Sequence, residues 1–317
     1  MAQDAVVIVA TYRRPDYLRT CLQHLHSQTT VPARIVVVDA SPDELTVPVV
    51  AEFPGVEYRR NDLGVGTLAA SRAIGSHDAT EDVIAFLDDD AYAEPEWLEH
   101  ILAAYDAPSI GAVGGRARNE NDDEEQDGVD RIGRLLRNGR LTGNFAADPG
   151  HNVDTDHMLG ANMTVRTDVL RSFGGIHDYY PGTCFREDTD LSLRVRKAGY
   201  RIRYAPDAVA LHVAGDYAKG RRFDLRYRYY GARNHVVLLR KTLGWRDPHL
   251  TRYLLSVPGA LLSTVFEGLQ ATELRHGLSA RLRGAAGGVV RAATDAWGTA
   301  VGVFVAQPDR AAGVASR

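Results

Sequence analysis

The sequence predicts an α/β fold in which a mostly parallel, open, twisted sheet is flanked by helices. Over the first 115 of the 317 residues, short apolar runs alternate with helical patterns, as in parallel sheets with helices on both faces. Polar residues recur where these runs end, at Thr11, Asp39 and Asp88–Asp90. Ligands of open α/β sheets bind beyond the carboxyl ends of the strands. With 44% hydrophobic and 25% charged residues, the composition is that of a globular protein.

The elements of this first part follow one another in a regular order. A helical pattern follows Pro15, with apolar residues spaced by three or four positions. Glu94–Glu96 opens another helix, because proline is tolerated in a first turn and acids suit the positive end of the helix dipole. Leu68–Ile74 has a helical pattern as well. The expected strands are Ala5–Thr11, Arg34–Asp39, Gly55–Arg60, Val83–Leu87 and Ile110–Gly114.

The remaining residues form three segments of different character. Residues 117–156 are acidic and glycine-rich, so we expect an excursion over one face of the sheet that acts as a weakly packed lid. From residue 221 the pattern is helical, and its most apolar stretch, 253–266, is interrupted at Pro258 and is too short to span a membrane. Between them we expect strands near 162–165, 201–205 and 208–213 and a helix over 187–197.

The cysteines and the first residues indicate a reducing compartment. Cys21 and Cys184 lie far apart, which excludes a disulfide scaffold and a cysteine-based zinc site. Residues 6–9 are apolar, but no basic stretch precedes them and no small-residue cleavage site follows, so we expect a buried strand rather than a signal peptide. We therefore expect a cytoplasmic protein, with peripheral contact at the cytoplasmic face of the membrane as a further expectation.

Charge is distributed unevenly along the chain. Residues 76–156 carry 20 acidic and six basic side chains, whereas residues 191–252 carry 15 basic and four acidic ones. A basic segment can face phosphates, anionic lipid or nucleic acid, so a non-enzymatic module that binds anionic surfaces is one alternative. The acidic middle of the chain argues against nucleic acid as a partner. Arginine far outnumbers lysine, but a GC-rich genome explains such an excess without any function.

Three adjacent aspartates, Asp88, Asp89 and Asp90, follow a predicted buried strand. Neighbouring carboxylates repel one another unless a cation or hydrogen-bond donors compensate. In an extended segment Asp88 and Asp90 point to one side and Asp89 to the other. Two carboxylates on one side suit a hard divalent ion, Mg²⁺ or Mn²⁺, whose coordination is completed by water and substrate phosphates. A solvated acidic turn is the alternative interpretation.

A second acidic group, Glu187, Asp188 and Asp190, opens the predicted helix over 187–197. The helix dipole favours a carboxylate there, which explains one acid comfortably but three less well. A general base that takes a proton from a hydroxyl group is the functional interpretation. His212 follows an apolar run. A lone histidine is more often structural than a ligand, but imidazole is a normal partner of Mn²⁺-type ions and would complete the predicted metal site.

Short motifs are distributed over residues 5–215 at Ala10–Arg14, Val37–Ser41, Asn61–Arg72, Phe86–Asp90, Gly160–Asn162, Phe173–Gly175, Glu187–Asp188 and His212. In order and spacing they resemble the family 2 glycosyltransferases, which have the GT-A fold. Each motif is weak alone, but together they are specific. Residues 229–234 look like a helix of the rhamnosyltransferase-like members. One departure is Arg13, where the family usually carries asparagine.

The resemblance implies a role for most of these residues. Asp188 would be the catalytic base, with Glu187 beside it positioning the acceptor. Asp88, Asp90 and His212 would hold Mg²⁺ or Mn²⁺. The nucleotide-sugar-binding set that the resemblance implies is Thr11, Tyr12, Arg13, Asp39 (which would accept a hydrogen bond from the base), Arg72, Asp88, Asp89, Gly160, Ala161 and Asn162.

The resemblance also implies a reaction and a domain organisation. The reaction would be inverting, metal-dependent transfer of a sugar from a nucleotide-diphosphate sugar, with dTDP- or UDP-sugars favoured, to a hydroxyl of a glycan, lipid-linked or natural-product acceptor. Residues 1–220 would form the GT-A catalytic domain, with a nucleotide-binding half over 1–115 and an acceptor half over 157–220. The basic start and the apolar stretches of the helical region over 221–317 indicate, independently of the resemblance, homodimer formation ahead of peripheral membrane contact.

A sugar nucleotidyltransferase is the rival enzyme, because it shares the α/β architecture and the need for a metal ion. Such an enzyme should carry a glycine-rich loop with a basic residue directly after the first strand, to bind a triphosphate. Residues 11–15 read Thr-Tyr-Arg-Arg-Pro, without glycine. The sequence therefore favours glycosyl transfer over nucleotidyl transfer.

Overall fold

The computed structural model describes residues 3–119, 127–213, 224–270 and 278–312. The chain divides into two compact units. Unit 1 comprises residues 1–135, 141–216 and 309–317, and unit 2 comprises residues 136–140 and 217–308. The chain thus leaves unit 1 after residue 216 and returns to it at residue 309. The predicted domain boundary between residues 220 and 221 lies outside the described residues.

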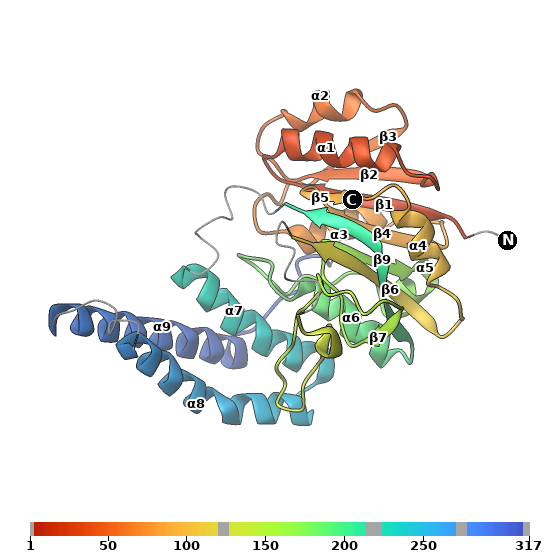
Figure 1. The fold of residues 1–317 in the computed structure, drawn as a ribbon. Helices are drawn as coiled ribbons and strands as arrows, with labels where there is room; N and C mark the ends of the chain where they lie inside the picture. Colours follow the sequence, from red (N-terminus) through yellow and green to blue (C-terminus); the bar gives the residue numbers. More distant parts are fainter. Residues whose placement is uncertain (1–2, 120–126, 214–223, 271–277, 313–317) are drawn as a thin grey trace. The chain divides into compact units, whose positions relative to one another are not determined.

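Unit 1 is built on a mixed sheet with the spatial order β3-β2-β1-β4-β8-β6-β9-β5, and β7 also pairs with β9 (Figure 1). Strands β3, β2, β1 and β4 are parallel to one another, and β6 is parallel to β9. Strand β8 runs antiparallel to β4 and β6, and β5 and β7 run antiparallel to β9. The strands are Ala5–Thr11 (β1), Arg34–Asp39 (β2), Val56–Arg60 (β3), Val83–Asp88 (β4), Ala91–Ala93 (β5), Ile110–Arg118 (β6), Val153–Thr155 (β7), Asn162–Arg166 (β8) and Arg201–His212 (β9).

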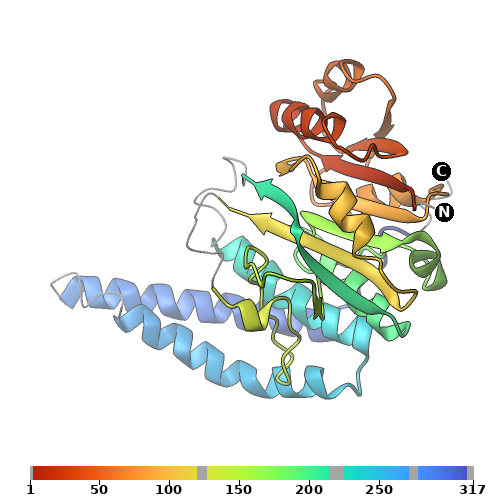
Figure 2. The ribbon, with the colours of Figure 1, turned by 45° about the vertical axis from the view of Figure 1, so that its right-hand side comes forward.

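Helices cover both faces of this sheet, as the two views show (Figures 1 and 2). Alternation along β1 sends Val7 and Val9 to one face, where they join a core cluster with residues of α1 and α4. It sends Val6 and Ile8 to the other face, where they join residues of α5 and α6. The helices of unit 1 are Pro15–His26 (α1), Thr46–Ala51 (α2), Leu68–Ser76 (α3), Trp97–Ala103 (α4), Thr167–Ser172 (α5) and Glu187–Lys197 (α6).

The structure differs from the predicted elements at β9. The two strands expected near 201–205 and 208–213 are one strand with a shift of register against β6. Ala205 pairs with Gly115 and Val209 pairs with Arg116, so the intervening residues of β9 have no partner in register. The register shift accounts for the two strands expected from the sequence, because a bulge interrupts the alternation of side chains that marks a continuous strand. The short elements β5, β7, α2 and α5 were not predicted.

The excursion is anchored to the sheet over most of its described length. Strand β7 pairs with β9, and Ile132 and Ala147 are buried against Tyr204 of β9. The Tyr204 hydroxyl also reaches the carbonyl oxygens of Phe145 (3.0 Å) and Ala147 (2.8 Å). The expectation of a weakly packed lid is therefore wrong for these residues. Residues 120–126 of the expected lid lie outside the described part of the chain.

Unit 2 is helical, as predicted, and contains α7 (Leu225–Leu238), a π-helical turn (Leu239–Leu243), α8 (Pro248–Gln270) and α9 (Leu278–Phe304). Helix α9 packs along both α7 and α8. Gly298 and Gly302 of α9 allow the close approach to α7, since a Cβ at either position would collide with an α7 backbone carbonyl. Helix α8 continues through Pro258 instead of ending there. Among the described residues, no helix is long and apolar enough to cross a membrane.

Candidate active site

The carboxyl ends of β1, β2 and β4 lie next to one another at one edge of the sheet. Thr11 at the end of β1 pairs in register with Asp39 at the end of β2. Ala10 pairs with Asp88 at the end of β4. The polar residues that the sequence placed at three strand ends are thus neighbours, as predicted, at the edge where α/β sheets bind their ligands.

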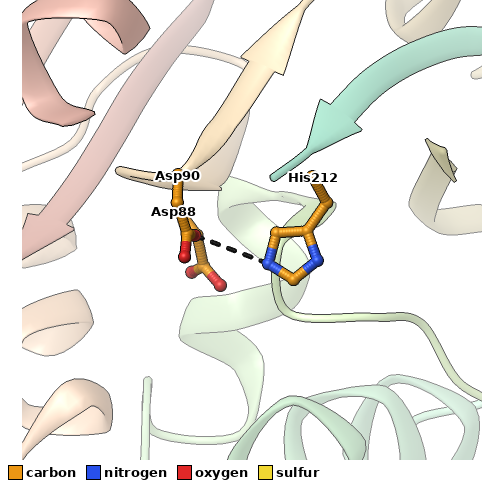
Figure 3. Close-up of side chains that lie close together, drawn as sticks. All are labelled: Asp88, Asp90 and His212. Atoms are coloured by element: carbon orange, nitrogen blue, oxygen red, sulfur yellow. Dashed lines mark ion pairs between the residues drawn. The ribbon is translucent and has the colours of Figure 1, made fainter. Parts of the chain in front are cut away.

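Asp88, Asp90 and His212 converge beyond this edge (Figure 3). One ligand atom from each lies within 4.8 Å of the other two, which is compatible with one shared ion. His212 Nε2 is 3.4 Å from Asp90 Oδ1. Strand β5 produces this arrangement, because its antiparallel pairing with β9 sets Ala91 opposite His212, and the Val213 amide donates to the Asp90 carbonyl at 3.0 Å.

Asp89 faces away from this cluster and binds the loop after β1. Its Oδ2 accepts a hydrogen bond from the Thr11 hydroxyl at 2.7 Å, and its Oδ1 accepts one from Arg14 Nη1 at 3.0 Å. The same Arg14 nitrogen is 2.6 Å from Asp90 Oδ2. Burial raises the pKa of Asp89 to about 7, although Arg14 opposes the shift. Arg14 therefore compensates two of the three repelling carboxylates, a role that its position in the first motif did not reveal.

Asp39 is fully buried, and both of its oxygens have partners within the protein. Oδ1 accepts the Ser41 amide at 2.8 Å, and Oδ2 accepts the Tyr58 hydroxyl at 3.2 Å, with Arg60 at 3.6 Å. A nucleotide base that donates to Asp39, as expected, would therefore bind a carboxylate that already accepts hydrogen bonds from Ser41 and Tyr58. Neither Tyr58 nor Arg60 was singled out from the sequence, because their strand carries no motif.

Tyr12 and Arg13 lie on the loop between β1 and α1. The Arg13 amide donates to Ser41 Oγ at 2.8 Å, which ties this loop to the turn after β2. Arg13 has a φ of 55°, which is uncommon for a residue other than glycine. Its guanidinium is exposed and lies 5.7 Å from the centre of the Tyr12 ring. This residue, where the family usually carries asparagine, therefore presents a cation beside an aromatic ring.

Arg72 joins the two acidic groups. Its guanidinium is buried, and it donates to Asp88 Oδ1 at 3.1 Å, to the Gly160 carbonyl at 2.8 Å and to Glu187. Burial raises the pKa of Glu187, and the guanidinium of Arg72 opposes that shift. The sequence predicted that Arg72 lines the nucleotide pocket. In the structure it lies beneath the site, where it fixes Asp88 relative to the start of α6.

Asp188 is more accessible than its neighbour Glu187. The Gly160 amide donates to Asp188 Oδ2 at 3.0 Å, and the Thr189 amide donates to Oδ1 at 2.6 Å. Glycine at position 160 lets the backbone pass close to Arg72 and Glu187, because a Cβ there would lie 3.0 Å from the Arg72 guanidinium and 3.2 Å from Glu187. The two amide donors fix the orientation of the Asp188 carboxylate.

Asn162 is a structural residue in this arrangement. Its amide accepts from Trp97 Nε1 at 2.8 Å and donates to the carbonyls of Arg116 (3.1 Å) and Ala208 (3.0 Å). The side chain is fully buried, so its polar atoms join three parts of the sheet instead of facing a sugar. Ala161 contributes its carbonyl, which accepts the Asp88 amide at 3.4 Å.

Comparison with known proteins identifies the family. The model of the family described as "Glycosyl transferase family 2" matches residues 6–170, more than half of the chain. The chain belongs to glycosyl transferase family 2. The chain is 22% identical over 218 residues to the O-antigen chain rhamnosyltransferase RfbN of Salmonella typhimurium, a match that covers 65% of each chain. It is 26% identical over 268 residues to the pre-mycofactocin glycosyltransferase of Mycobacterium tuberculosis, with 83% of this chain and 52% of that protein covered.

Solved structures confirm the predicted GT-A fold of this family 2 glycosyltransferase. The mannosyltransferase PcManGT of Pyrobaculum calidifontis, in complex with GDP-Man and Mn²⁺, superposes with a TM-score of 0.59 at 17% identity and covers 96% of this chain and 88% of its own. GalNAc-T7, in complex with UDP, GalNAc and Mn²⁺, gives a TM-score of 0.54 at 13% identity and covers 75% of this chain and 48% of its own. At these identities the likeness establishes the fold alone. The matched regions are also less than two thirds of the length of the Salmonella and Mycobacterium relatives.

Proposed function

We propose that this glycosyltransferase moves a sugar, with inversion, from a nucleotide-diphosphate sugar to an acceptor hydroxyl, and that it depends on Mg²⁺ or Mn²⁺. The observation that carries the proposal is the connection between its two acidic groups. Arg72 touches Asp88 of the candidate metal site and Glu187 at the start of α6, and Gly160 touches both Arg72 and Asp188. A donor site and a proton acceptor are thereby held in one rigid network.

The residues of the candidate metal site fit a divalent cation. They offer two carboxylates and an imidazole, and Mn²⁺ and Mg²⁺ both accept oxygen ligands. When bound, such an ion neutralises the charge that develops on the departing diphosphate. The protein itself orients the two carboxylates. Arg14 binds Oδ2 of Asp90, and Arg72 binds Oδ1 of Asp88. Both side chains are thereby restrained before any ligand arrives.

Asp188 is the proposed general base. The acceptor hydroxyl oxygen forms a bond to the anomeric carbon while the bond from that carbon to the diphosphate oxygen breaks. The hydroxyl proton passes to the Asp188 carboxylate, whose orientation the Gly160 and Thr189 amides fix. A single displacement inverts the configuration at the anomeric carbon. Glu187 is bound to Arg72 and acts in this proposal by positioning the network.

The proposed donors are dTDP- and UDP-sugars. Asp39, beside Tyr58 and Ser41, and the loop carrying Tyr12 and Arg13 form the proposed contact surface for the nucleoside. Nucleotide sugars in general receive support from the two solved neighbours, one of which holds GDP-Man and the other UDP. The acceptor hydroxyl belongs to a glycan, a lipid-linked sugar or a natural product in this proposal.

The alternative of a non-enzymatic binder of anionic surfaces loses support in the structure. Several arginines of the basic segment are bound to acids of the same unit. Arg196 lies 2.8 Å from Asp156, and Arg203 lies 3.3 Å from Asp154. The acidic and basic segments thus neutralise one another at these positions. Membership of family 2 argues in the same direction, and also against a nucleotidyltransferase.

Turnover with a panel of UDP-, dTDP- and GDP-sugars tests the proposal. Each donor is assayed for release of nucleoside diphosphate with Mg²⁺, with Mn²⁺ and with EDTA, and thermal stabilisation is measured in parallel. We expect stabilisation by at least one donor and turnover that EDTA abolishes. Undiminished turnover in EDTA would contradict the metal assignment. Stabilisation by RNA or DNA alone, lost at high salt, would favour the anionic-surface binder.

We also propose that unit 2 mediates self-association or peripheral membrane contact. Helices α8 and α9 expose large apolar side chains, among them Leu255 at 77% and Phe304 at 84% exposure, and proteins rarely leave many such groups in water. The variants Leu255→Gln and Phe304→Gln are each compared with the parent protein. Sedimentation velocity measures self-association, and liposome co-sedimentation measures membrane contact. Removing everything after residue 245 is a poorer test, because residues 309–312 belong to unit 1.

A further inference from the structure

Residues 309–312 return to unit 1 and bind the loop that leads into α6. We infer that Arg310, with Asp309, is a positioning residue for the catalytic base: it clamps the loop at 173–186 that carries the chain to Asp188. The clamp itself is visible in the contacts of unit 1. Its effect on turnover rests on the proposed role of Asp188.

Arg310 joins two loops of unit 1. Its amide donates to the Asp178 carbonyl at 2.9 Å, and its Nη2 lies 2.7 Å from Asp178 Oδ1. The same nitrogen donates to the Gly66 carbonyl at 2.9 Å. Gly66 belongs to the loop before α3, the helix that carries Arg72. One guanidinium therefore connects the segment before Arg72 with the segment before Asp188.

Asp309 strengthens the same connection from the next position. Its Oδ2 is 2.7 Å from His177 Nδ1, and its Oδ1 accepts the amides of Asp178 (2.8 Å) and Ala311 (3.0 Å). Burial would raise the pKa of Asp309, but the hydrogen bonds from His177 and these amides outweigh it and lower that pKa. Asp309 and Arg310 thus bind two consecutive residues, His177 and Asp178, of the loop before α6.

Asp178 makes this docking energetically necessary. Its side chain is 1% exposed, and Arg310 supplies its ion pair. Oδ1 also accepts the Tyr180 amide at 3.2 Å, whereas Oδ2 has no hydrogen-bond partner among the described residues. A buried carboxylate that loses its cation is strongly destabilising, because neither water nor another charge compensates it. As long as Asp178 carries its charge, the loop can therefore keep this conformation only while Arg310 is docked.

The loop that the clamp holds has an uncommon backbone. Cys184 and Arg186 have positive φ values of 57° and 85°, and Arg186 is the residue directly before α6. A Cβ on Gly66 would lie 3.1 Å from the Gly182 carbonyl, so the two loops are in close contact. Residues in sparsely populated conformations persist only where their surroundings fix them. Arg310 is one of those restraints, and its loss should release the start of α6.

Arg310→Ala, Arg310→Lys and the double variant Asp178→Asn/Arg310→Ala test the inference. The control is Arg201→Ala, which breaks an ion pair of unit 1 with Asp154 (2.7 Å) in which both side chains are about half exposed. Hydrogen exchange of residues 176–186, donor affinity by calorimetry, kcat and the KM for the acceptor are measured for each variant.

We expect Arg310→Ala to raise exchange of residues 176–186 and to lower kcat/KM for the acceptor by about tenfold or more, because small displacements of a catalytic group are costly. Donor affinity should change by less than about twofold, a free-energy difference below about 0.4 kcal/mol. The double variant should recover slow exchange, since it removes the buried charge. Arg310→Lys should lie between, and Arg201→Ala should match the parent.

Parent-like exchange and kinetics in Arg310→Ala would overturn the inference. So would an equal loss of donor affinity and acceptor turnover that the double variant fails to recover, because this pattern indicates general destabilisation. If the parent protein turns over no donor, the proposed function fails. The hydrogen exchange of Arg310→Ala, compared with that of the parent protein and of the double variant, then decides by itself whether Arg310 holds the loop.

Discussion

The two acidic groups of this family 2 member have similar sequences and different environments. In the first, Asp88–Asp90, Arg14 binds two carboxylates, and Asp88 keeps 27% of its side chain exposed. In the second, Glu187 is buried on Arg72 and Asp190 on Arg194, and Asp188 is the more accessible member. Each group thus combines buried carboxylates bound to arginines with one partly exposed member, Asp88 or Asp188, and Asp88 is itself bound to Arg72.

The comparison shows that arginines hold carboxylates of both groups in place, whereas Asp88 and Asp188 stay partly exposed. Arg14 and Arg72 lie far along the chain from most of the acids they bind, so the acidic motifs alone could not reveal these contacts. A carboxylate that its neighbours restrain and that is still partly exposed is suited to contact a ligand. The next four predictions break or sharpen this distinction, from the largest expected effect to the smallest.

Asp90→Ala should reduce turnover by about 10³-fold or more, because it removes a carboxylate of the candidate metal site and a partner of Arg14. Asp82→Ala, an exposed carboxylate at the amino end of the same strand, is the matched control and should retain activity. Steady-state kinetics and Mn²⁺ titration by calorimetry measure both effects. Full activity of Asp90→Ala in EDTA would disprove the metal assignment.

Asp188→Asn should lower kcat by about 10²–10⁴-fold with donor affinity unchanged, because the amide is nearly isosteric and cannot take up the proton. Asp190→Asn, two residues further along the same helix, should leave kcat close to the parent value, since Asp190 is bound to Arg194 at 2.8 Å. Single-turnover kinetics with donor calorimetry distinguish the two variants. Lost donor binding with near-normal turnover would make Asp188 a binding residue.

Arg72→Met should destabilise unit 1 by about 3–5 kcal/mol, because it leaves the buried Glu187 carboxylate without its cation. Adding Glu187→Gln should recover part of that loss, since the uncompensated charge is removed. Chemical denaturation of the single and double variants gives both numbers. If the two single changes are additive, Arg72 and Glu187 are not coupled and the proposed network is incorrect.

Acidification should have the smallest effect, acting through His157. Burial lowers the pKa of this imidazole, so the folded state binds fewer protons than the unfolded state near the ordinary histidine pKa. The resulting stabilisation is complete above about pH 6.5 and is lost as the pH falls below it. The slope of Tm between pH 7.5 and pH 5.5 should be shallower in His157→Gln. An unchanged slope would assign the acid sensitivity to other groups.

The first 115 residues were the most predictable part of the fold. Strands β1, β2 and β4 are continuous apolar runs that end in polar residues, and this pattern is specific to buried parallel strands. The strands β5 and β7 have three residues each, too few for a period of two to be recognised. Yet β5 is the element that sets Asp90 beside His212. The sequence named Asp90 and His212 as candidate metal ligands but did not reveal the strand pairing that brings them together.

Polar residues of the interior were the least predictable part of the site. The motif at 160–162 indicated that Asn162 binds the ligand. A sequence motif contains the amide but does not specify the direction in which its side chain points. Its three hydrogen bonds depend on the close approach of Gly115, where a Cβ would collide with the Asn162 side chain and the Ala208 carbonyl. Such contacts join residues more than 40 positions apart, so no local pattern encodes them.

The ion pair between Asp178 and Arg310 also sets an order of events during folding. The two residues are 132 positions apart, and the whole helical part of unit 2 lies between them in the chain. Contacts that close so long a segment pay a large loop-closure entropy and form after local ones. The strands and helices of the first 216 residues can therefore assemble while the loop before α6 still lacks its cation. The loop before α6 therefore reaches its final conformation only after the chain has returned from unit 2 to unit 1.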